Sequence, residues 1–128
     1  MQKEQLNAIT EKIVENTSEE NGYFVVATQM NYSADFVKNL AYNLRTRKSN
    51  LVMVVGSAAA GKATLTIMLG DDVVAKGVDA GAIVREAAKA IQGGGGGQKF
   101  FATAGGKNPD GLTEAIEKAK ALIMEILK

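Results

Sequence analysis

Residues 93–106 read GGGGGQKFFATAGG and hold seven of the chain's 14 glycines. Each glycine costs roughly 1 kcal/mol of backbone order relative to alanine, so the run from Gly93 to Gly97 needs a physical reason to stay ordered. A flexible linker would mix in serine and other polar residues, and it would not continue into Phe100 and Phe101. The stretch therefore predicts a glycine loop that either packs tightly or presents bare backbone amides to a phosphate or a nucleotide edge.

Apolar residues recur at helical spacing on both sides of this stretch. The segments that show this pattern cover residues 3–15, 34–48, 79–92 and 109–127. The predicted N-caps of the last three helices are Ser33, Asp79 and Asn108, and Pro109 falls at the first position of the final helix. The first segment has only a narrow apolar stripe, which is typical of a seam against another helix.

Three further segments have the composition of β-strands. Tyr23–Met30 is almost entirely apolar or β-forming, which predicts a strand covered on both sides, and Leu51–Val55 is a continuous apolar run. Ala63–Leu69 alternates between apolar residues and threonine, so it predicts a hairpin with the preceding strand. We therefore expect an α/β (α+β) fold, in which a small mixed sheet with a hairpin is covered by about three helices and preceded by an N-terminal helix.

The chain carries a net charge of only +1, but its charges are unevenly distributed. Residues 36–109 hold ten Lys and Arg against four acids, and no acid occurs between Asp35 and Asp71. A basic middle between acidic ends indicates an anionic partner for one face of the domain. Two alternatives stay open: the charges could neutralise each other in the folded protein, and cations at the end of the helix 34–48 would suit its dipole.

The chain contains no cysteine and no histidine, so it lacks the residues of cysteine nucleophiles, histidine acid–base pairs and the usual zinc sites. No apolar run approaches the ~20 residues that span a bilayer, and the N-terminus has no signal-peptide core. We expect a soluble, cytoplasmic protein without a membrane partner.

A near match to a nucleotide-binding loop runs from Gly56 through Gly61 to Lys62. Such a loop needs Ser or Thr directly after the lysine to hold magnesium, and Ala63 stands there instead. The next segment should also begin a helix facing the phosphate, whereas residues 63–69 have a strand pattern. We therefore predict no Walker site, no catalytic residue and no metal site in this chain.

Several motifs nevertheless resemble one known family. They are KGVDAG at 76–81, KAIQGGGGG at 89–97, ATAGGK at 102–107, the Gly61-Lys62 turn and the closing helix from Asp110. Over about residues 20–128 this pattern resembles the C-terminal end of alanyl-tRNA synthetases. It is also similar to the DHH-associated domain of a phosphoesterase superfamily, where the glycine run is typically followed by His. Gln98 takes that place here, which argues against a phosphoesterase-like role.

The resemblance implies a non-catalytic part of an alanine–tRNA ligase, whose upstream domains charge the tRNA, edit it and hold ATP, magnesium and zinc. The domain is expected to bind the outer corner of tRNA(Ala), to link aminoacylation with editing, and in some members to help dimerise the enzyme. Alternatives are a dimerisation or general nucleic-acid-binding module, or the substrate domain of a DHH-type phosphoesterase. Residues 1–20 would be the end of a helical connector and residues 21–128 the globular glycine-rich domain, so that Met1 is an internal methionine or a cloning boundary.

The candidate RNA-binding residues come from the basic helix end and from the glycine stretch. They are Arg45, Arg47, Lys48, Gly93, Gly94, Gly95, Gly96, Gly97, Gln98, Lys99, Phe100, Gly105, Gly106 and Lys107. The aromatic content is 5% and there is no Trp, so broad stacking of single-stranded bases is not expected. Of Phe100 and Phe101, one is predicted to face the core and the other to be free for a ribose or a base; the alternative is that both pack under the loop.

Overall fold

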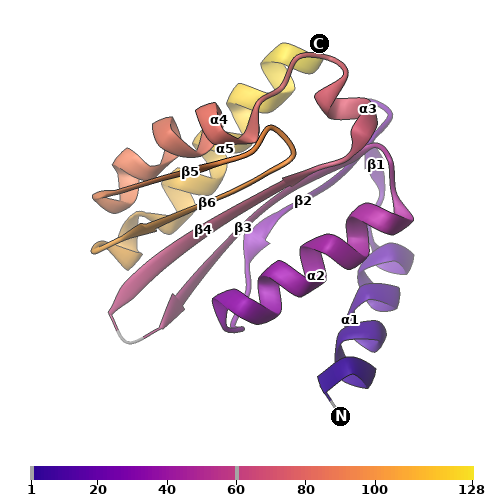
Figure 1. Cartoon of the computed structure of the whole chain (residues 1–128), viewed down its shortest axis with the longest axis horizontal. Helices are drawn as coiled ribbons and strands as arrows, with labels where there is room; N and C mark the ends of the chain where they lie inside the picture. Colours follow the sequence, from indigo (N-terminus) through magenta and orange to yellow (C-terminus); the bar gives the residue numbers. More distant parts are fainter. Residues whose placement is uncertain (1, 60) are drawn as a thin grey trace.

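The computed structural model describes residues 2–59 and 61–128 and shows one mixed sheet with helices on both faces (Figure 1). The helices are α1 (Gln2–Asn16), α2 (Ala34–Arg47), α3 (Asp71–Val74), α4 (Ala80–Ala87) and α5 (Leu112–Leu127), with 3-10 turns η1 (Ala88–Ile91) and η2 (Pro109–Gly111). The strands are β1 (Glu19–Glu20), β2 (Tyr23–Gln29), β3 (Leu51–Ala59), β4 (Lys62–Leu69), β5 (Gly93–Gly97) and β6 (Phe101–Gly106).

The order of strands across the sheet is β1-β2-β3-β4-β6-β5. The β2–β3 pair is parallel and the other neighbouring pairs are antiparallel. Parallel neighbours need a crossover connection, and α2 supplies it between β2 and β3. The β3–β4 hairpin, the mixed sheet and the preceding helix α1 confirm the predicted fold class.

Helix α2 begins as its sequence predicts. The Ser33 side chain accepts a hydrogen bond from the Phe36 amide at 3.2 Å, and the apolar face that includes Leu40 and Leu44 is fully buried. The narrow stripe of α1 packs against the same core cluster, and Asn43 of α2 donates a hydrogen bond to Thr10 of α1 at 3.3 Å. The predicted seam is therefore made with another helix of the same chain.

The core has two layers because neighbouring residues of a strand point to opposite faces of the sheet. Val52 and Val54 of β3 belong to the layer under α4 and α5, whereas Met53 and Val55 belong to the layer under α1 and α2. Figure 1 shows this arrangement, with α1 and α2 on one side of the sheet and α4 and α5 on the other. Burial on both faces explains the nearly continuous apolar runs.

Two predicted helices differ from the structure at their ends. The helix expected at 79–92 is α-helical only to Ala87 and continues as the 3-10 turn η1, which ends at Gln92, a residue in the left-handed conformation with φ 54°. The helix expected from Pro109 begins at Leu112, after the 3-10 turn η2. Asn108 makes no capping bond; its side-chain nitrogen donates instead to the Ala90 carbonyl at 3.4 Å.

The near match to a nucleotide-binding loop lies in the β3–β4 hairpin. Gly56 is a buried residue within β3, where an added Cβ would lie 2.9 Å from a methyl carbon of Leu112. Gly61, at φ 76°, forms the turn, and Lys62 begins β4. The predicted strand 23–30 ends at Gln29, and the expectation of cover on both sides is only partly met: Phe24 is buried, while Tyr23 is half-buried.

Candidate nucleic-acid interface

The glycine run is an edge strand, so the prediction of a loop is wrong. Gly93–Gly97 forms β5, which pairs antiparallel with β6 and ends the sheet. Four of its five residues are exposed, and Gly96 is half-buried. Backbone N–H groups of an edge strand alternately face the neighbouring strand and the open side. Because glycine has no side chain, the exposed residues of this strand present bare backbone amides to solvent. The sequence predicted such bare amides, but in a loop.

Alternate glycines of β5 have different steric roles. An added Cβ would lie 1.9 Å from the Gly105 carbonyl oxygen at Gly93, and 2.1 Å from the Thr103 carbonyl oxygen at Gly95. At Gly94 it would meet nothing within 4 Å. Glycine is thus required where β5 lies against the backbone of β6, and it leaves open space at Gly94. Tight packing therefore accounts for Gly93 and Gly95, while the open space at Gly94 leaves its backbone accessible; contact of that backbone with a phosphate stays a prediction.

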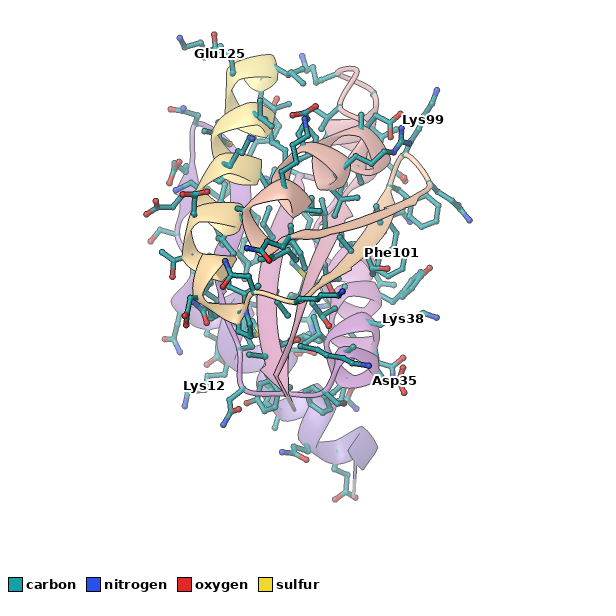
Figure 2. All side chains as sticks on the ribbon, turned by 90° about the vertical axis from the view of Figure 1, so that its left-hand side faces the viewer. Lys12, Asp35, Lys38, Lys99, Phe101 and Glu125 are labelled. Carbon is teal, nitrogen blue, oxygen red and sulfur yellow. The ribbon has the colours of Figure 1, made fainter. Side chains whose placement is uncertain are left out.

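The tip of the β5–β6 hairpin is held by backbone hydrogen bonds. The Gln98 amide donates to the Phe101 carbonyl at 2.8 Å, the Ala80 amide donates to the Lys99 carbonyl at 2.9 Å, and the Leu69 amide donates to the Phe100 carbonyl at 2.7 Å. These bonds tie the tip to β4 and to the start of α4. The side chain of Lys99 is exposed, and Figure 2 shows it projecting outward on the same side of the molecule as Phe101 and Lys38.

Both phenylalanines after the glycine run belong to one aromatic cluster. The ring of Tyr42 lies 5.4 Å from that of Phe101 and 6.5 Å from that of Phe100, and the Arg45 guanidinium lies 4.6 Å from the Phe100 ring centre. Both rings are half-buried against the core layer under α2. Both rings therefore pack, but against α2 and Tyr42 and not under the glycine run as the alternative had it; Tyr42 itself stays 40% exposed.

The three cations at the end of α2 are engaged within the domain. Arg45 forms an ion pair with Asp71 at 2.5 Å and donates to the Leu69 carbonyl at 3.1 Å. Arg47 pairs with Glu11 of α1, and Lys48 lies over the Phe24 ring at 5.2 Å.

The hydrogen bond between Arg47 and Glu11 lowers the pKa of the carboxyl below its ordinary value and raises the pKa of the guanidinium. The charges of Arg45 and Arg47 are therefore neutralised by acids within the domain, as one of the two alternatives proposed. A role of these two residues in RNA binding stays a prediction.

The remaining predicted residues, Gly105, Gly106 and Lys107, lie at the other end of the hairpin. Gly106 needs its small size, because an added Cβ would lie 2.2 Å from the Ile91 carbonyl oxygen. Gly105 is open, with its nearest such contact at 4.0 Å, and the Lys107 side chain is exposed. Since β6 spans six residues, Lys107 and Lys99 mark opposite ends of a strand that is roughly 17 Å long.

Two cations beside the hairpin are absent from the sequence-based candidates. Arg85 of α4 has its Nε 3.8 Å from where a Cβ of Gly96 would lie, so it reaches the edge strand from the helix. Lys62 lies beside Gly105 and Lys107 around one surface pocket. The pairing of β4 with β6 brings Lys62 there, and no local sequence pattern shows that pairing.

This arrangement suits binding of a polyanion more than chemistry. The open β5 edge combines exposed glycine backbone with the nearby cations Arg85, Lys99 and Lys107. In the part of the chain that the structure describes, no group of three or more His, Cys, Asp or Glu side chains is placed to hold a metal ion. None of the described helices is long and apolar enough to cross a membrane.

Comparisons with known proteins agree with this picture. Residues 21–125 match the family model of the DHHA1 domain. Alanine–tRNA ligases of Bacteroides fragilis and Bacteroides thetaiotaomicron are each 50% identical over 121 residues, which is 94% of this chain and 14% of each ligase. The chain thus spans about 14% of the length of these relatives.

Solved structures show the same fold. The C-Ala domain of Aquifex aeolicus alanyl-tRNA synthetase superposes with a TM-score of 0.71 at 29% identity, covering 88% of this chain and 97% of that domain. A DHH-domain protein described as a member of a family of ribosomal proteins has a TM-score of 0.59 at 11% identity, over 94% of this chain and 30% of its own. The resemblance to the C-terminal end of alanyl-tRNA synthetases is confirmed, and the chain belongs to the DHHA1 domain family.

Proposed function

We propose that this domain is part of an alanine–tRNA ligase and binds the outer corner of tRNA(Ala). The observation that carries the proposal is the open β5 edge, an exposed run of glycines with Lys99 at one end and Lys107 at the other. Phosphate contacts position a protein on a nucleic acid, and they come from Lys, Arg and backbone amides. The edge offers all three, with Arg85 beside Gly96, toward the Lys99 end.

The face beside this edge extends the proposed surface. Lys99 and Lys38 form no ion pair among the described residues, and Figure 2 shows them on one side of the molecule with Phe101 between them. The half-exposed ring of Tyr42 lies within the same cluster as Phe101. A ribose or an unstacked base at the tRNA corner would contact these rings, while the cations contact the flanking phosphates.

Within the whole ligase, the role of the domain is to hold one tRNA while the upstream domains aminoacylate and edit it. The upstream domains would supply the catalytic residues and bind ATP, magnesium and zinc, and the reaction would take place in the cytoplasm. Removing residues 21–128 from the ligase should then lower both the charging and the editing rate at subsaturating tRNA. The decrease in both rates should become smaller at saturating tRNA, because the removed domain contributes to tRNA binding, a step that both reactions share.

Binding can be tested directly with this chain. We expect it to bind tRNA(Ala) more tightly than an unrelated tRNA or an RNA duplex, with an affinity that falls steeply as salt rises from 50 to 200 mM, roughly as phosphate contacts require. Lys99→Gln should lower the slope of log affinity against log salt by about 0.7 to 0.9, the value for one lost phosphate contact. The matched control is Lys118→Gln, which removes an exposed lysine of α5 that has no ion pair among the described residues.

Two outcomes would count against the proposal. Equal affinity for all three RNAs would favour the alternative of a general nucleic-acid-binding module. An absence of measurable binding, in a protein that melts cooperatively, would favour a dimerisation module, whose mass would double in sedimentation with rising concentration.

A further inference from the structure

A surface pocket opens where the β3–β4 hairpin meets the base of the β5–β6 hairpin. Its volume is about 380 Å³, within the range of small-ligand sites. Lys62 and Thr64 line it from β4, Gln92 from the end of η1, and Gly105 and Lys107 from the end of β6. All of its lining side chains are neutral or positively charged.

Strand register places the two lysines beside each other. Ala63 of β4 is paired with Gly106 of β6; Lys62 precedes Ala63 and Lys107 follows Gly106, so both lysines lie at this end of the sheet, and both line the pocket. Like charges that share one site repel each other. Neither lysine forms an ion pair with any described residue. The domain thus keeps two uncompensated ammonium groups at one end of its sheet, where an anion would relieve their repulsion.

The remaining groups of the pocket add hydrogen-bonding capacity. Thr64 contributes a hydroxyl and Gln92 a side-chain amide. Both groups can donate a hydrogen bond to a phosphate oxygen. Gly105 and Gly106 are part of the lining, so a ligand can approach the backbone there. Gly61 at φ 76° turns the chain directly before Lys62. The Gly61-Lys62 pair therefore positions a lysine by means of a hairpin turn, without the helix that a nucleotide-binding loop requires.

We propose that this pocket holds one phosphodiester group of the bound RNA, with the Lys62 and Lys107 ammonium groups on either side of it. The inference rests on the proposed function and adds to it a defined phosphate site at one end of the β5 edge. An RNA strand that follows the edge from Lys99 would reach this pocket after passing β6, which is roughly 17 Å long, a distance of a few nucleotides.

The salt dependence of tRNA binding tests whether the two lysines share one phosphate. Lys62→Gln and Lys107→Gln should each lower the slope of log affinity against log salt by much less than one contact, because the remaining lysine still neutralises the phosphate. The double variant should lower it by about 0.7 to 0.9. The control is Lys76→Gln, an exposed lysine next to α3, and should leave the slope unchanged. A loss of 0.7 to 0.9 for each single variant would overturn the shared site, and so would a double variant that behaves like Lys76→Gln.

Melting temperature gives a readout that needs no RNA. Because the two ammonium groups repel each other, each single variant should melt at a slightly higher temperature than the parent chain at low salt, and the gain should shrink at high salt. A lower melting temperature at low salt in both variants would overturn the inference that the pair is uncompensated.

Amide chemical shifts locate the ligand. Titration of the ¹⁵N-labelled chain with a short oligouridylate should shift the Gly105 and Gly106 resonances, and Lys62→Gln/Lys107→Gln should abolish these shifts. Inorganic phosphate is the second arm: if it shifts the same resonances at the same or lower concentration, the site takes free phosphate and the phosphodiester assignment is wrong. If oligouridylate shifts the pocket while tRNA(Ala) binds no better than other RNAs, the proposed function fails and the phosphate site stands. If tRNA(Ala) binds selectively with an unchanged slope in the double variant, the phosphate site fails and the function stands.

Discussion

Alanine substitution at two adjacent glycines of β5 separates packing from backbone access. At Gly95 the new Cβ would lie 2.1 Å from the Thr103 carbonyl oxygen and 2.5 Å from the Ala104 Cα, so β5 and β6 would have to move apart by about 1 Å. At Gly94 the new Cβ meets nothing within 4 Å, and the backbone is not in the left-handed region. Gly94→Ala is therefore the sterically matched control for Gly95→Ala.

The free energy of unfolding should change in opposite directions. Overpacking costs about 1–3 kcal/mol, occasionally more, so we expect Gly95→Ala to lose about 2 kcal/mol. Gly94→Ala should gain about 0.4–1 kcal/mol, because alanine restricts the unfolded chain. For a domain of this size 1 kcal/mol corresponds to roughly 4 °C, so the two melting temperatures should differ by roughly 10 °C.

Thermal and urea unfolding, followed by circular dichroism, measure both variants. Equal stability of the two proteins would refute the assignment of Gly95 as a packing residue. The affinity for tRNA(Ala) should then be compared in Gly94→Ala and Gly94→Val, which fill open space at the edge without removing a charge. We expect weaker binding with an unchanged salt slope, and unchanged affinity in a stable Gly94→Val protein would show that RNA does not approach the β5 backbone there.

Two further predictions concern charges. Arg47 lowers the pKa of Glu11, so this pair stabilises the fold above the carboxyl's unfolded pKa and loses that effect as pH falls through the lowered folded pKa. The difference in melting temperature between the parent chain and Glu11→Gln should therefore be present at pH 7 and shrink as the pH is lowered below the carboxyl's ordinary pKa. The chain should not hydrolyse ATP, because Lys62 follows a hairpin turn and precedes Ala63; ATPase activity that disappears in Lys62→Ala would contradict this.

Local sequence patterns were sufficient to predict the elements that are stabilised by contacts between residues close together in the sequence. Helix α2 was predicted within a residue or two of its ends, because Ser33 caps it and its apolar face repeats at helical spacing. The β3–β4 hairpin was predicted from alternation and a glycine turn, which are also local. The family resemblance rested on the glycine stretch, whose spacing of residues is distinctive without any three-dimensional information.

The glycine stretch itself shows where local patterns fail. Glycine has low strand propensity, so Gly93–Gly97 could not be predicted as a strand from its own residues. It is a strand because β6 lies beside it and supplies hydrogen-bond partners, and β6 in turn pairs with β4. The same long-range pairing, and not any sequence motif, brings Lys62 to Lys107.

The sequence by itself determined helix α2, the β3–β4 hairpin and the membership of a family with a characteristic glycine run, because each depends on residues close together in the chain. Only the tertiary structure decided which cations are free. Arg45 and Arg47 were paired with Asp71 and Glu11 by the packing of elements that lie 26 and 36 residues away, whereas Lys62, Lys99 and Lys107 were left without a described carboxylate partner. Electrostatic interactions act through space, so the charge available for binding RNA is set by the fold and not by the order of residues.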